Sequence, residues 1–208
     1  MIITIDGLSA NGKSTLAKKI SEEINFKNFN TGAIYRCIAI EIINKKLDIN
    51  DLENTLKILE NIKIDFIDNK TFLNGKDVTK LLRTEEISMK SAEYGGIPKI
   101  KEVVRKIQKT FLQENDTVME GRDIGTRIAP NADIKFYLYA NIETRVKRLQ
   151  GATNTDINEI RENLKLRDYI EINEGHFIKP VDAIEIDTTN KTLDEVYELM
   201  MKEIKKLI

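Results

Sequence analysis

The sequence predicts an α/β fold in which helices flank a parallel five-stranded sheet. Short apolar runs rich in isoleucine and valine alternate with longer stretches of helical periodicity along most of the 208 residues. Parallel strands need long crossover connections, which are usually helices, so this alternation indicates a parallel sheet. One stretch near residues 63–82 breaks the alternation and predicts a small antiparallel insert. Ligands of such parallel sheets bind at the carboxyl ends of the strands.

The first predicted elements are a strand, a loop and a helix. Ile2–Ile5 is apolar and β-branched, and helical spacing begins by Thr15. The loop between them fits the spacing G-x-x-x-x-G-K-[ST] and consists of Gly7, Leu8, Ser9, Ala10, Asn11, Gly12, Lys13 and Ser14. Its backbone N–H groups and the positive end of the following helix favour a polyphosphate. A chance match in a turn is the alternative, and the flanking strand and helix argue against it.

Single residues of this loop suit the chemistry of a bound nucleoside triphosphate. Gly7 and Gly12 allow the backbone to approach a phosphate closely. Lys13 supplies positive charge for the β- and γ-phosphates, and the Ser14 hydroxyl suits Mg²⁺. We therefore expect a nucleoside triphosphate and Mg²⁺ as ligands.

The middle of the chain predicts a helix pair and the antiparallel insert. Residues 29–30 form a short second strand, and helices follow at about 31–45 and 51–61. The turn pairs Asp68-Asn69 and Asn74-Gly75 then divide alternating apolar runs into short hairpin strands.

From residue 84 onward the chain predicts three more strands and five more helices. The strands lie at 118–119, 134–138 and 183–186, and the helices at 84–94, 98–113, 142–150, 156–174 and from 192. Thr192 and Glu195 form a capping box at the start of the last helix. We expect one apolar face on that helix, formed by Leu193, Val196, Met200 and Ile204.

Composition excludes several classes of protein. The chain is 41% hydrophobic and 32% charged, and its net charge of −1 argues against nucleic-acid or anionic-membrane partners. No apolar run approaches the ~20 residues that span a bilayer, and the first strand leaves no room for a signal peptide. The single cysteine, Cys37, is expected to be a small buried apolar residue. We expect a cytoplasmic monomer.

Arginine is concentrated in one part of the chain. Six of the nine arginines fall between positions 122 and 167, together with only three of the 24 lysines. They are Arg122, Arg127, Arg145, Arg148, Arg161 and Arg167. The planar guanidinium binds phosphate bidentately, which favours phosphate binding for the group as a whole. Ordinary surface charge is the alternative, favoured for Arg161 and open for Arg127.

A phosphate loop alone is compatible with a GTPase, a motor ATPase or a kinase. The Asn-Lys-x-Asp string with which GTPases read guanine is absent, and a motor ATPase needs a longer chain. We therefore predict a small phosphotransferase, which needs a second anion site for its acceptor. Thr31 is expected to cap a helix there, with Tyr35 and Arg36 projecting from its first turn. Tyr35 is equally compatible with a half-buried core position.

Six strings of residues resemble those of bacterial cytidylate kinases and occur in the same order. They are 7–15, Asn30–Arg36, Asn74–Val78, Arg83–Ser88, Glu120–Thr126 and Ile186–Thr189. The resemblance spans nearly the whole chain. It implies transfer of the γ-phosphoryl group of ATP to CMP or dCMP. It also implies a core of residues 1–45 and 114–208, an insert at about 46–113 that binds the nucleoside monophosphate, and a lid at about 145–170.

Matching positions to the family pattern implies roles for single residues on the phosphate side. Gly7–Thr15 hold the ATP phosphates, with Lys13 among the catalytic residues. Arg36 and Arg122 resemble the clamps on the acceptor phosphate, with Thr31 and Tyr35 beside them.

The resemblance also implies roles around the acceptor and the lid. Asp123 resembles the carboxylate that accepts a hydrogen bond from the cytosine amino group. Arg167 resembles an arginine at the acceptor's sugar. Arg145 and Arg148 begin the lid and are expected, like Arg122, to stabilise charge on the moving phosphoryl group.

Several positions depart from the family pattern. Ala92 and Lys101 stand where a serine and an arginine usually read the base, and Lys101 lacks the bidentate geometry of arginine. Glu171 replaces the aspartate that meets the ribose hydroxyls, and Glu174 stands in place of an arginine. The segment after Arg148 is also shorter than usual. His176, the only histidine, is expected to belong to a surface loop.

These departures leave the strength of the cytosine preference and the choice between ribose and deoxyribose open. One alternative is a kinase with a broadened or altered acceptor, such as UMP. Another is a nucleotide-binding regulatory module without transfer activity. The intact set of Lys13, Arg36 and Arg122 favours the kinase.

Overall fold

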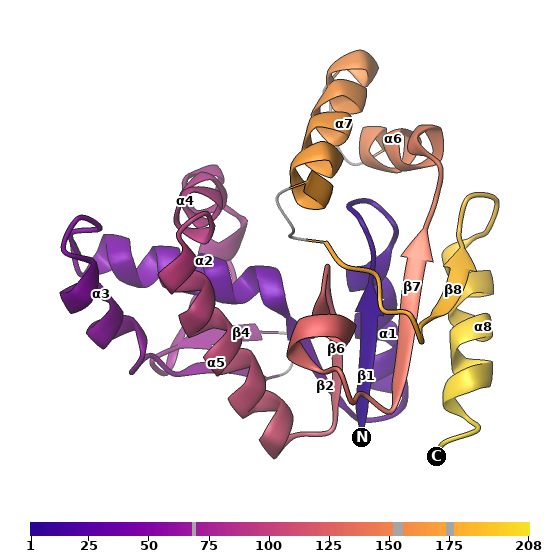
Figure 1. Cartoon of the computed structure of the whole chain (residues 1–208), viewed down its shortest axis with the longest axis horizontal. Coiled ribbons are helices and arrows are strands. Elements are labelled where there is room, and N and C mark those ends of the chain that lie inside the picture. The colour runs from indigo at the N-terminus through magenta and orange to yellow at the C-terminus, as the bar shows by residue number, and fades with distance from the viewer. Residues whose placement is uncertain (68–69, 152–155, 174–176) are drawn as a thin grey trace. The chain divides into compact units, whose positions relative to one another are not determined.

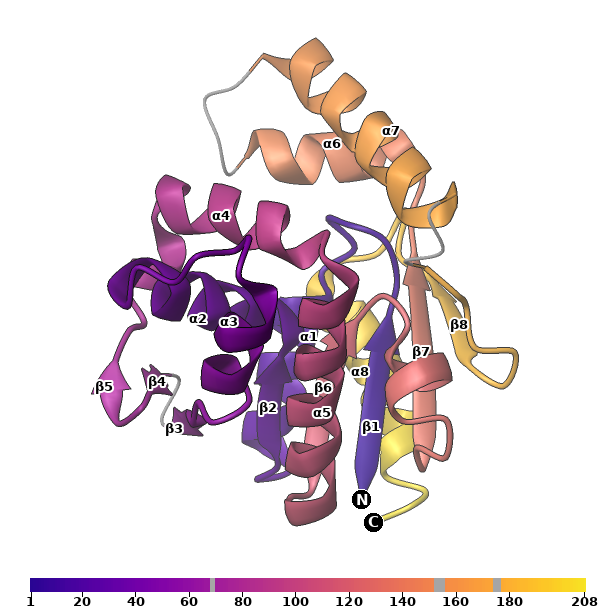
Figure 2. The same cartoon turned by 60° about the vertical axis from the view of Figure 1, so that its left-hand side comes forward.

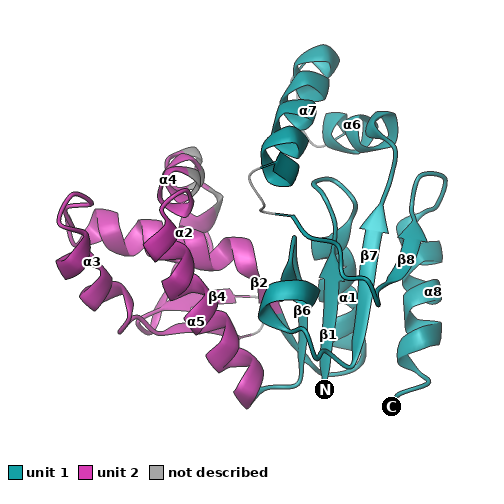
Figure 3. Ribbon diagram, in the orientation of Figure 1, with its two compact units in different colours: residues 1–28, 115–208 teal, residues 29–114 magenta. Residues whose placement is uncertain are grey.

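The computed structural model describes residues 1–67, 70–151, 156–173 and 177–208, without the side chains of residues 83, 85, 88 and 92. The chain divides into two compact units (Figure 3). The first unit contains residues 1–28 and 115–208, and the second contains residues 29–114. Glu174 and His176 lie outside the described residues, as does the side chain of Ala92.

A five-stranded sheet organises the first unit (Figure 1). Its strands lie in the order β2 (Lys27–Asn30), β6 (Thr117–Gly121), β1 (Ile2–Asp6), β7 (Ile134–Tyr139) and β8 (Ile184–Asp187). β1 is parallel to both β6 and β7, and β7 is parallel to β8. The predicted parallel sheet is therefore confirmed. Because β1 is central, the loop that follows it leaves the sheet between two neighbouring strand ends.

Helices α1 (Lys13–Glu23) and α8 (Leu193–Ile204) share one core with this sheet. Leu16 and Ile20 of α1 are fully or almost fully buried, as is Phe136 at the centre of β7. A short π-helical turn, η2 (Ile124–Ile128), follows β6 and was not predicted. This core anchors the start of α1 directly behind the phosphate loop.

The last helix confirms its predicted cap but corrects its predicted apolar face. Thr192 and Glu195 form the capping box, and Val196 and Met200 are buried. Leu193, predicted on the same apolar face as these residues, is 47% exposed. It is the first residue of the helix, and its side chain lies over Gly12, where an added Cβ would come within 3.0 Å of Leu193 Cδ2.

Two further helices of the first unit, α6 (Ile142–Gln150) and α7 (Ile157–Asn173), pack against each other (Figure 2). Val146 of α6 and Ile160 and Leu164 of α7 form a small apolar core of their own. This separate core lets the two helices hold together as one element.

The second unit combines helices with a three-stranded antiparallel sheet, as predicted. Its elements are α2 (Thr31–Asn44), α3 (Leu52–Leu59), β3 (Ile64–Ile67), β4 (Lys70–Leu73), β5 (Lys76–Asp77), η1 (Leu81–Arg83), α4 (Glu85–Gly95) and α5 (Pro98–Glu114). Asn74 and Gly75 join β4 to β5 with φ of 50° and 78°, the left-handed values that a tight hairpin turn needs. Phe29, Phe66 and Phe111 pack together with ring centroids 4.4–6.1 Å apart.

The start of α2 corrects the predicted helix cap. Asn30, not Thr31, is the N-cap, and its side chain accepts a hydrogen bond from Ala33 N–H. Thr31 is the first helical residue, and its Oγ1 accepts from Gln108 Nε2 at 3.1 Å.

Cys37 is fully buried, and burial raises the pKa of its thiol to about 12. It is therefore a packing residue, as predicted.

Within the described ranges, no helix is both long and apolar enough to cross a membrane.

Truncating the centre of β7 should destabilise the fold strongly. Phe136 is fully buried in the shared core, so Phe136→Ala should lower the free energy of unfolding by about 3–5 kcal/mol. Tyr169→Ala, which removes an aromatic ring that is 67% exposed, is the control and should change it by less than about 0.5 kcal/mol. Urea unfolding followed by circular dichroism measures both, and equal losses would contradict the assigned core.

Candidate active site

The phosphate loop is pressed against the end of β7. Gly7 has φ of 148°, and a Cβ at this position would lie 2.2 Å from the Leu138 carbonyl oxygen. Asn11 Nδ2 donates to that same oxygen at 3.1 Å and to Leu8 O at 3.3 Å. Gly12 adopts a left-handed φ of 82° immediately before α1. The loop is thus held in place from both sides, which preorganises its backbone for an anion.

Lys13 is buried beneath this loop. The residue is 5% exposed, and its Nζ donates to Leu8 O at 2.7 Å. The pKa of Lys13 is lowered to about 7, chiefly by burial and to a smaller extent by the nearby positive charge of Arg122. A phosphate placed here would supply the missing negative charge and favour the protonated amine.

Oxygen atoms next to Lys13 suit Mg²⁺. Ser14 Oγ donates to Glu120 Oε1 at 3.0 Å, and Glu120 is almost fully buried near the end of β6. Hydroxyl and carboxylate oxygens are the hard ligands that Mg²⁺ prefers. Within the described part of the chain, no cluster of three or more His, Cys, Asp or Glu side chains could hold a metal. This set therefore fits a Mg²⁺ ion whose other ligands are phosphate oxygens and water, as is usual at nucleotide sites.

The carboxylate of Asp6 supports the site at the end of β1. Asp6, the last residue of β1, is fully buried and accepts hydrogen bonds from the N–H groups of Ile124 and Gly125 at 2.9 and 2.8 Å. Burial raises the pKa of Asp6 to about 6. Asp6 thereby holds the turn after β6, which carries Arg122 and Asp123, against the end of β1.

Arg122 connects the phosphate loop to α7. Its Nη1 donates to Gly7 O at 3.2 Å, its Nη2 to Ser9 Oγ at 2.9 Å and its Nε to Glu171 Oε2 at 2.6 Å. The other oxygen of Glu171 accepts from Arg167 Nε at 3.0 Å. Burial acts to raise the pKa of Glu171, but the two arginines outweigh it and hold that pKa below its ordinary value. Glu171 therefore remains ionised between two guanidinium groups.

Two arginines of α6 also reach the loop. Arg145 is almost fully buried, forms a bidentate pair with Asp168 of α7 and donates to Ser9 O at 3.3 Å. Arg148 donates to Ala10 O at 3.4 Å and to Thr188 O at 2.7 Å. Three guanidinium groups, from the turn after β6 and from α6, therefore converge on one glycine-containing loop.

Comparisons with known proteins identify the family of this site. A sequence profile described as cytidylate kinase matches residues 3–206. The cytidylate kinase of Clostridioides difficile strain 630 is 33% identical over 211 residues, which cover 98% of each chain. That of Fusobacterium nucleatum subsp. nucleatum is 34% identical over 214 residues, covering 100% of this chain and 98% of the relative. The chain belongs to the cytidylate kinase family.

Solved structures agree on the fold. Shikimate kinase from Bacteroides thetaiotaomicron has a TM-score of 0.53 and 10% identity, with 99% of this chain and 98% of that chain covered. TT1252 from Thermus thermophilus has a TM-score of 0.56 and 18% identity, with 100% and 97% covered. Identities this low concern the fold alone.

Membership of the cytidylate kinase family makes the chain a phosphotransferase that acts on nucleoside monophosphates, as the sequence resemblance implied.

The first unit of this cytidylate kinase family member brings most of the predicted phosphate-side residues together. Arg122, Arg145 and Arg148 all donate to atoms of the loop, and Arg167 joins them through Glu171. Outside this network, Arg127 Nε lies 3.4 Å from the Asp123 carboxylate. Arg161 pairs with Glu143, as a surface charge would.

The predicted acceptor residues Thr31, Tyr35, Arg36 and Lys101 lie in the second unit. Tyr35 is half-buried and packs beside α4, where a Cβ on Gly95 would come within 3.4 Å of its ring. Arg36 is also half-buried and follows it on α2. Lys101 is half-buried on α5.

Sequence reasoning missed two partners of the arginines. Asp168 holds Arg145, and Thr188 holds Arg148. Thr188 lies inside the string Ile186–Thr189 that resembles the family, which was the available signal, whereas Asp168 lies outside the six strings. Their roles depend on contacts across 23 and 40 residues of chain, and spacing along the sequence does not define such contacts.

Binding of a nucleoside triphosphate should take up close to one proton at about pH 8. The pKa of Lys13 is about 7 here, so the amine is mostly neutral at about pH 8, and bound phosphates favour its charged form. A pKa that rises on binding draws a proton from solvent, and the uptake should diminish toward about pH 6, where the free amine is already charged. Calorimetric titration with ATP in buffers of different ionisation enthalpy measures this uptake.

The matched control is Lys13→Arg, because arginine carries its proton in both states. Its proton uptake should fall close to zero at about pH 8. Uptake that persists unchanged in this variant would show that another group titrates.

Proposed function

We propose that this protein transfers the γ-phosphoryl group of ATP to CMP and dCMP, with Mg²⁺ as cofactor. The observation that carries the proposal is the convergence of Arg122, Arg145 and Arg148 on the phosphate loop of a cytidylate kinase family member. Such a concentration of guanidinium groups suits two polyanionic substrates brought together.

The reaction needs positioning and charge more than covalent chemistry. A phosphate oxygen of the acceptor forms a bond to the γ-phosphorus while the bond from that phosphorus to the β,γ-bridging oxygen breaks. The attacking oxygen is already anionic near neutral pH, so no general base is required. Lys13 and the loop N–H groups hold the β- and γ-phosphates, and Arg122 binds charge on the transferring or acceptor phosphate. Bound Mg²⁺ would neutralise charge between the phosphates beside Ser14 and Glu120.

The arginines can exchange protein partners for phosphate. Arg122 donates to Gly7 O and Ser9 Oγ, and Arg145 donates to Ser9 O, all within the loop that is expected to hold phosphates. A phosphate oxygen is a stronger acceptor than these neutral oxygens because the bond is charge-assisted on both sides. The same guanidinium groups are therefore proposed to exchange these loop oxygens for substrate phosphates.

Helices α6 and α7 form the proposed lid, at about residues 145–170. Their separate apolar core of Val146, Ile160 and Leu164 supports movement as one body. The Arg122–Glu171 contact at the carboxyl end of α7 already joins the proposed lid to the turn after β6, and Arg145 joins it to the loop. Closure with both substrates bound would exclude water and limit wasteful ATP hydrolysis.

Recognition of the acceptor remains part of the proposal. Arg36 and Tyr35 are proposed to hold its phosphate with Thr31, and Asp123 to accept a hydrogen bond from the cytosine amino group. Lys101 is proposed to meet the base as well. On the sugar side, Arg167 and Glu171 are proposed to contact the acceptor's ribose. We also propose residues 1–45 and 114–208 as the catalytic core, about 46–113 as the acceptor-binding insert, and a cytoplasmic monomer without nucleic-acid or membrane partners.

The decisive test measures ADP production from ATP and Mg²⁺ with CMP, dCMP, UMP and AMP as separate acceptors and with no acceptor. We expect turnover with CMP and dCMP to exceed turnover with UMP and AMP. Comparable rates with UMP would contradict a cytosine-specific site. ATP binding without any acceptor-dependent ADP would contradict the kinase proposal itself.

Removing Arg122 should impair transfer far more than binding of ATP. Arg122→Ala should lower kcat/KM for CMP by about 10²–10⁴-fold, because one charge-stabilising arginine is lost from the transition state. Arg161→Ala is the matched control, since this arginine pairs with Glu143 on the surface. Coupled-assay kinetics measure both variants, and near-normal turnover of Arg122→Ala would refute its catalytic role.

A further inference from the structure

Arg127 lies in η2, the π-helical turn that directly follows Asp123. Its Nε lies 3.4 Å from Oδ2 of Asp123, four residues earlier in the chain. The two side chains are 33% and 21% exposed, so water screens this ion pair only in part. The guanidinium of Arg127 therefore contacts the carboxylate that is proposed to read the acceptor base.

The backbone of η2 determines how Arg127 approaches Asp123. The N–H group of Arg127 donates to the Asp123 carbonyl oxygen at 2.9 Å, and Thr126 Oγ1 donates to the same oxygen at 3.1 Å. The N–H group of Ala129 donates to Ile124 O at 2.8 Å, which is the spacing of five residues that defines a π-turn. Asp123 and Arg127 are thus joined through both their backbones and their side chains.

The turn is itself anchored to the sheet. The Asp6 carboxylate accepts hydrogen bonds from two N–H groups of the turn at 2.9 and 2.8 Å. A Cβ at Gly125 would lie 2.8 Å from Pro180 Cγ and 3.0 Å from Thr4 Oγ1, so the turn is closely enclosed. The fold therefore sets the backbone position of Arg127, and the ion pair is not needed to hold it.

Two neighbouring charges act on the Asp123 carboxylate in opposite directions. Burial chiefly raises the pKa of Asp6 to about 6, and the charge of Asp123 adds to this rise, so the two carboxylates are close enough to repel each other. Arg127 attracts the Asp123 carboxylate. All three nitrogens of the Arg122 guanidinium donate to the phosphate loop or to α7. The attraction by Arg127 therefore offsets the repulsion and orients the Asp123 carboxylate.

The direction of a carboxylate decides how well it reads a base. An ionised carboxylate only accepts hydrogen bonds, so it binds the amino group at C4 of cytosine and repels the carbonyl oxygen at C4 of uracil. A hydrogen bond weakens steeply when its donor and acceptor are misaligned. Loss of orientation should therefore cost a cytosine nucleotide more affinity than a uracil nucleotide.

We propose that Arg127 is a positioning residue for base recognition, which holds the Asp123 carboxylate in the direction that accepts a hydrogen bond from the cytosine amino group. This inference rests on the proposed function, in which Asp123 reads the base. Arg127 acts through Asp123 and contributes to the choice of acceptor, not to the transfer of the phosphoryl group. Its role therefore differs both from phosphate binding and from ordinary surface charge.

Isothermal titration calorimetry with CMP and with UMP, in the absence of ATP, tests the inference apart from phosphoryl transfer. Arg127→Ala should weaken CMP binding by about three- to tenfold, as for the loss of a partly screened ion pair, and UMP binding by less than about twofold. Arg127→Lys keeps the positive charge and should recover part of the loss. Equal weakening for CMP and UMP would overturn the inference, because it would indicate a contact with the phosphate, and so would unchanged CMP binding.

The matched control is Arg161→Ala, because this arginine pairs with Glu143 on the surface. It should leave the affinities for CMP and UMP within about twofold of the original protein. ATP binding should also remain within about twofold in Arg127→Ala, which shows that the variant is folded and that its phosphate loop is intact. A loss of CMP affinity in Arg161→Ala as large as that in Arg127→Ala would contradict a specific role for Arg127.

A double-mutant cycle assigns the effect to Asp123. Asp123→Asn should by itself reduce the preference for CMP over UMP, and Arg127→Ala should then cause little further loss. Additive losses would show that Arg127 acts independently of Asp123 and would overturn the inference. An unchanged preference in Asp123→Asn would remove the proposed base reader and the inference with it. Acceptor-dependent ADP production, measured on the same proteins, reports separately on phosphoryl transfer.

Discussion

The close approach between Gly7 and the end of β7 is the constraint on which the catalytic side of this protein depends. Only a residue without a Cβ fits there, because that atom would lie 2.2 Å from the Leu138 carbonyl oxygen. The same oxygen accepts from Asn11, so the loop is held to the sheet at its beginning and in its middle. The loop then enters α1 at Lys13, and α1 is anchored by the core it shares with the sheet and α8. The backbone donors are consequently fixed before any anion binds.

Burying so much positive charge around one loop has a cost that neighbouring groups offset. Asp168 forms a bidentate pair with Arg145, and Glu171 lies between Arg122 and Arg167. Among the described residues, no carboxylate forms an ion pair with Lys13, and burial lowers its pKa to about 7. This imbalance favours an incoming polyanion, because phosphate restores the charge balance that the protein leaves incomplete. Loop oxygens and carboxylates hold the arginines beside the loop before any phosphate is bound.

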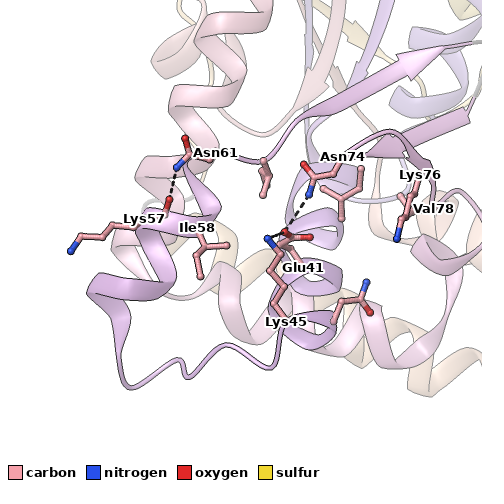
Figure 4. Close-up of a pocket in the computed structure, with 11 residues that line it drawn as sticks. Glu41, Lys45, Lys57, Ile58, Asn61, Asn74, Lys76 and Val78 are labelled. Atoms are coloured by element: carbon pink, nitrogen blue, oxygen red, sulfur yellow. Dashed lines mark hydrogen bonds and ion pairs between the residues drawn. The ribbon is translucent and has the colours of Figure 1, made fainter.

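Helix α2 gives the second unit two distinct faces. Tyr35 and Arg36 lie in its first turns, and Glu41 lies near its end, which the C-cap residue Lys45 follows. Asn74 ties the β4–β5 turn to α2 through Glu41, and its own Oδ1 accepts from Lys63 N–H. The polar network thus fixes the hairpin against the helix. An apolar contact could hold the hairpin as well, but it would not present a carboxylate to the pocket of about 710 Å³ between α2, α3 and the hairpin (Figure 4).

Local patterns in the sequence were sufficient for the fold and the phosphate loop. Hydrophobic periodicity predicted the strands of the parallel sheet and the α-helices close to their observed places, although not the short turns η1 and η2. The spacing of Gly7, Gly12 and Lys13 predicted the loop, because both kinds of signal act over a few residues. The N-cap of α2 was predicted one residue late, since Asn30 and Thr31 are both good caps and only the backbone distinguishes them. Leu193 matched the apolar spacing of α8 but lies at its exposed first position.

The sequence by itself therefore determined the parallel sheet, the antiparallel insert, the phosphate loop and the family to which the chain belongs. The tertiary structure alone decided which carboxylate holds which arginine, that Lys13 is buried enough to lose its ordinary pKa, and that α2 and α3 enclose a pocket with the hairpin. The physical reason is distance along the chain. Secondary structure and loop chemistry depend on neighbours a few residues apart, whereas ion pairs, burial and cavities arise where segments such as β6 and α7 meet after folding.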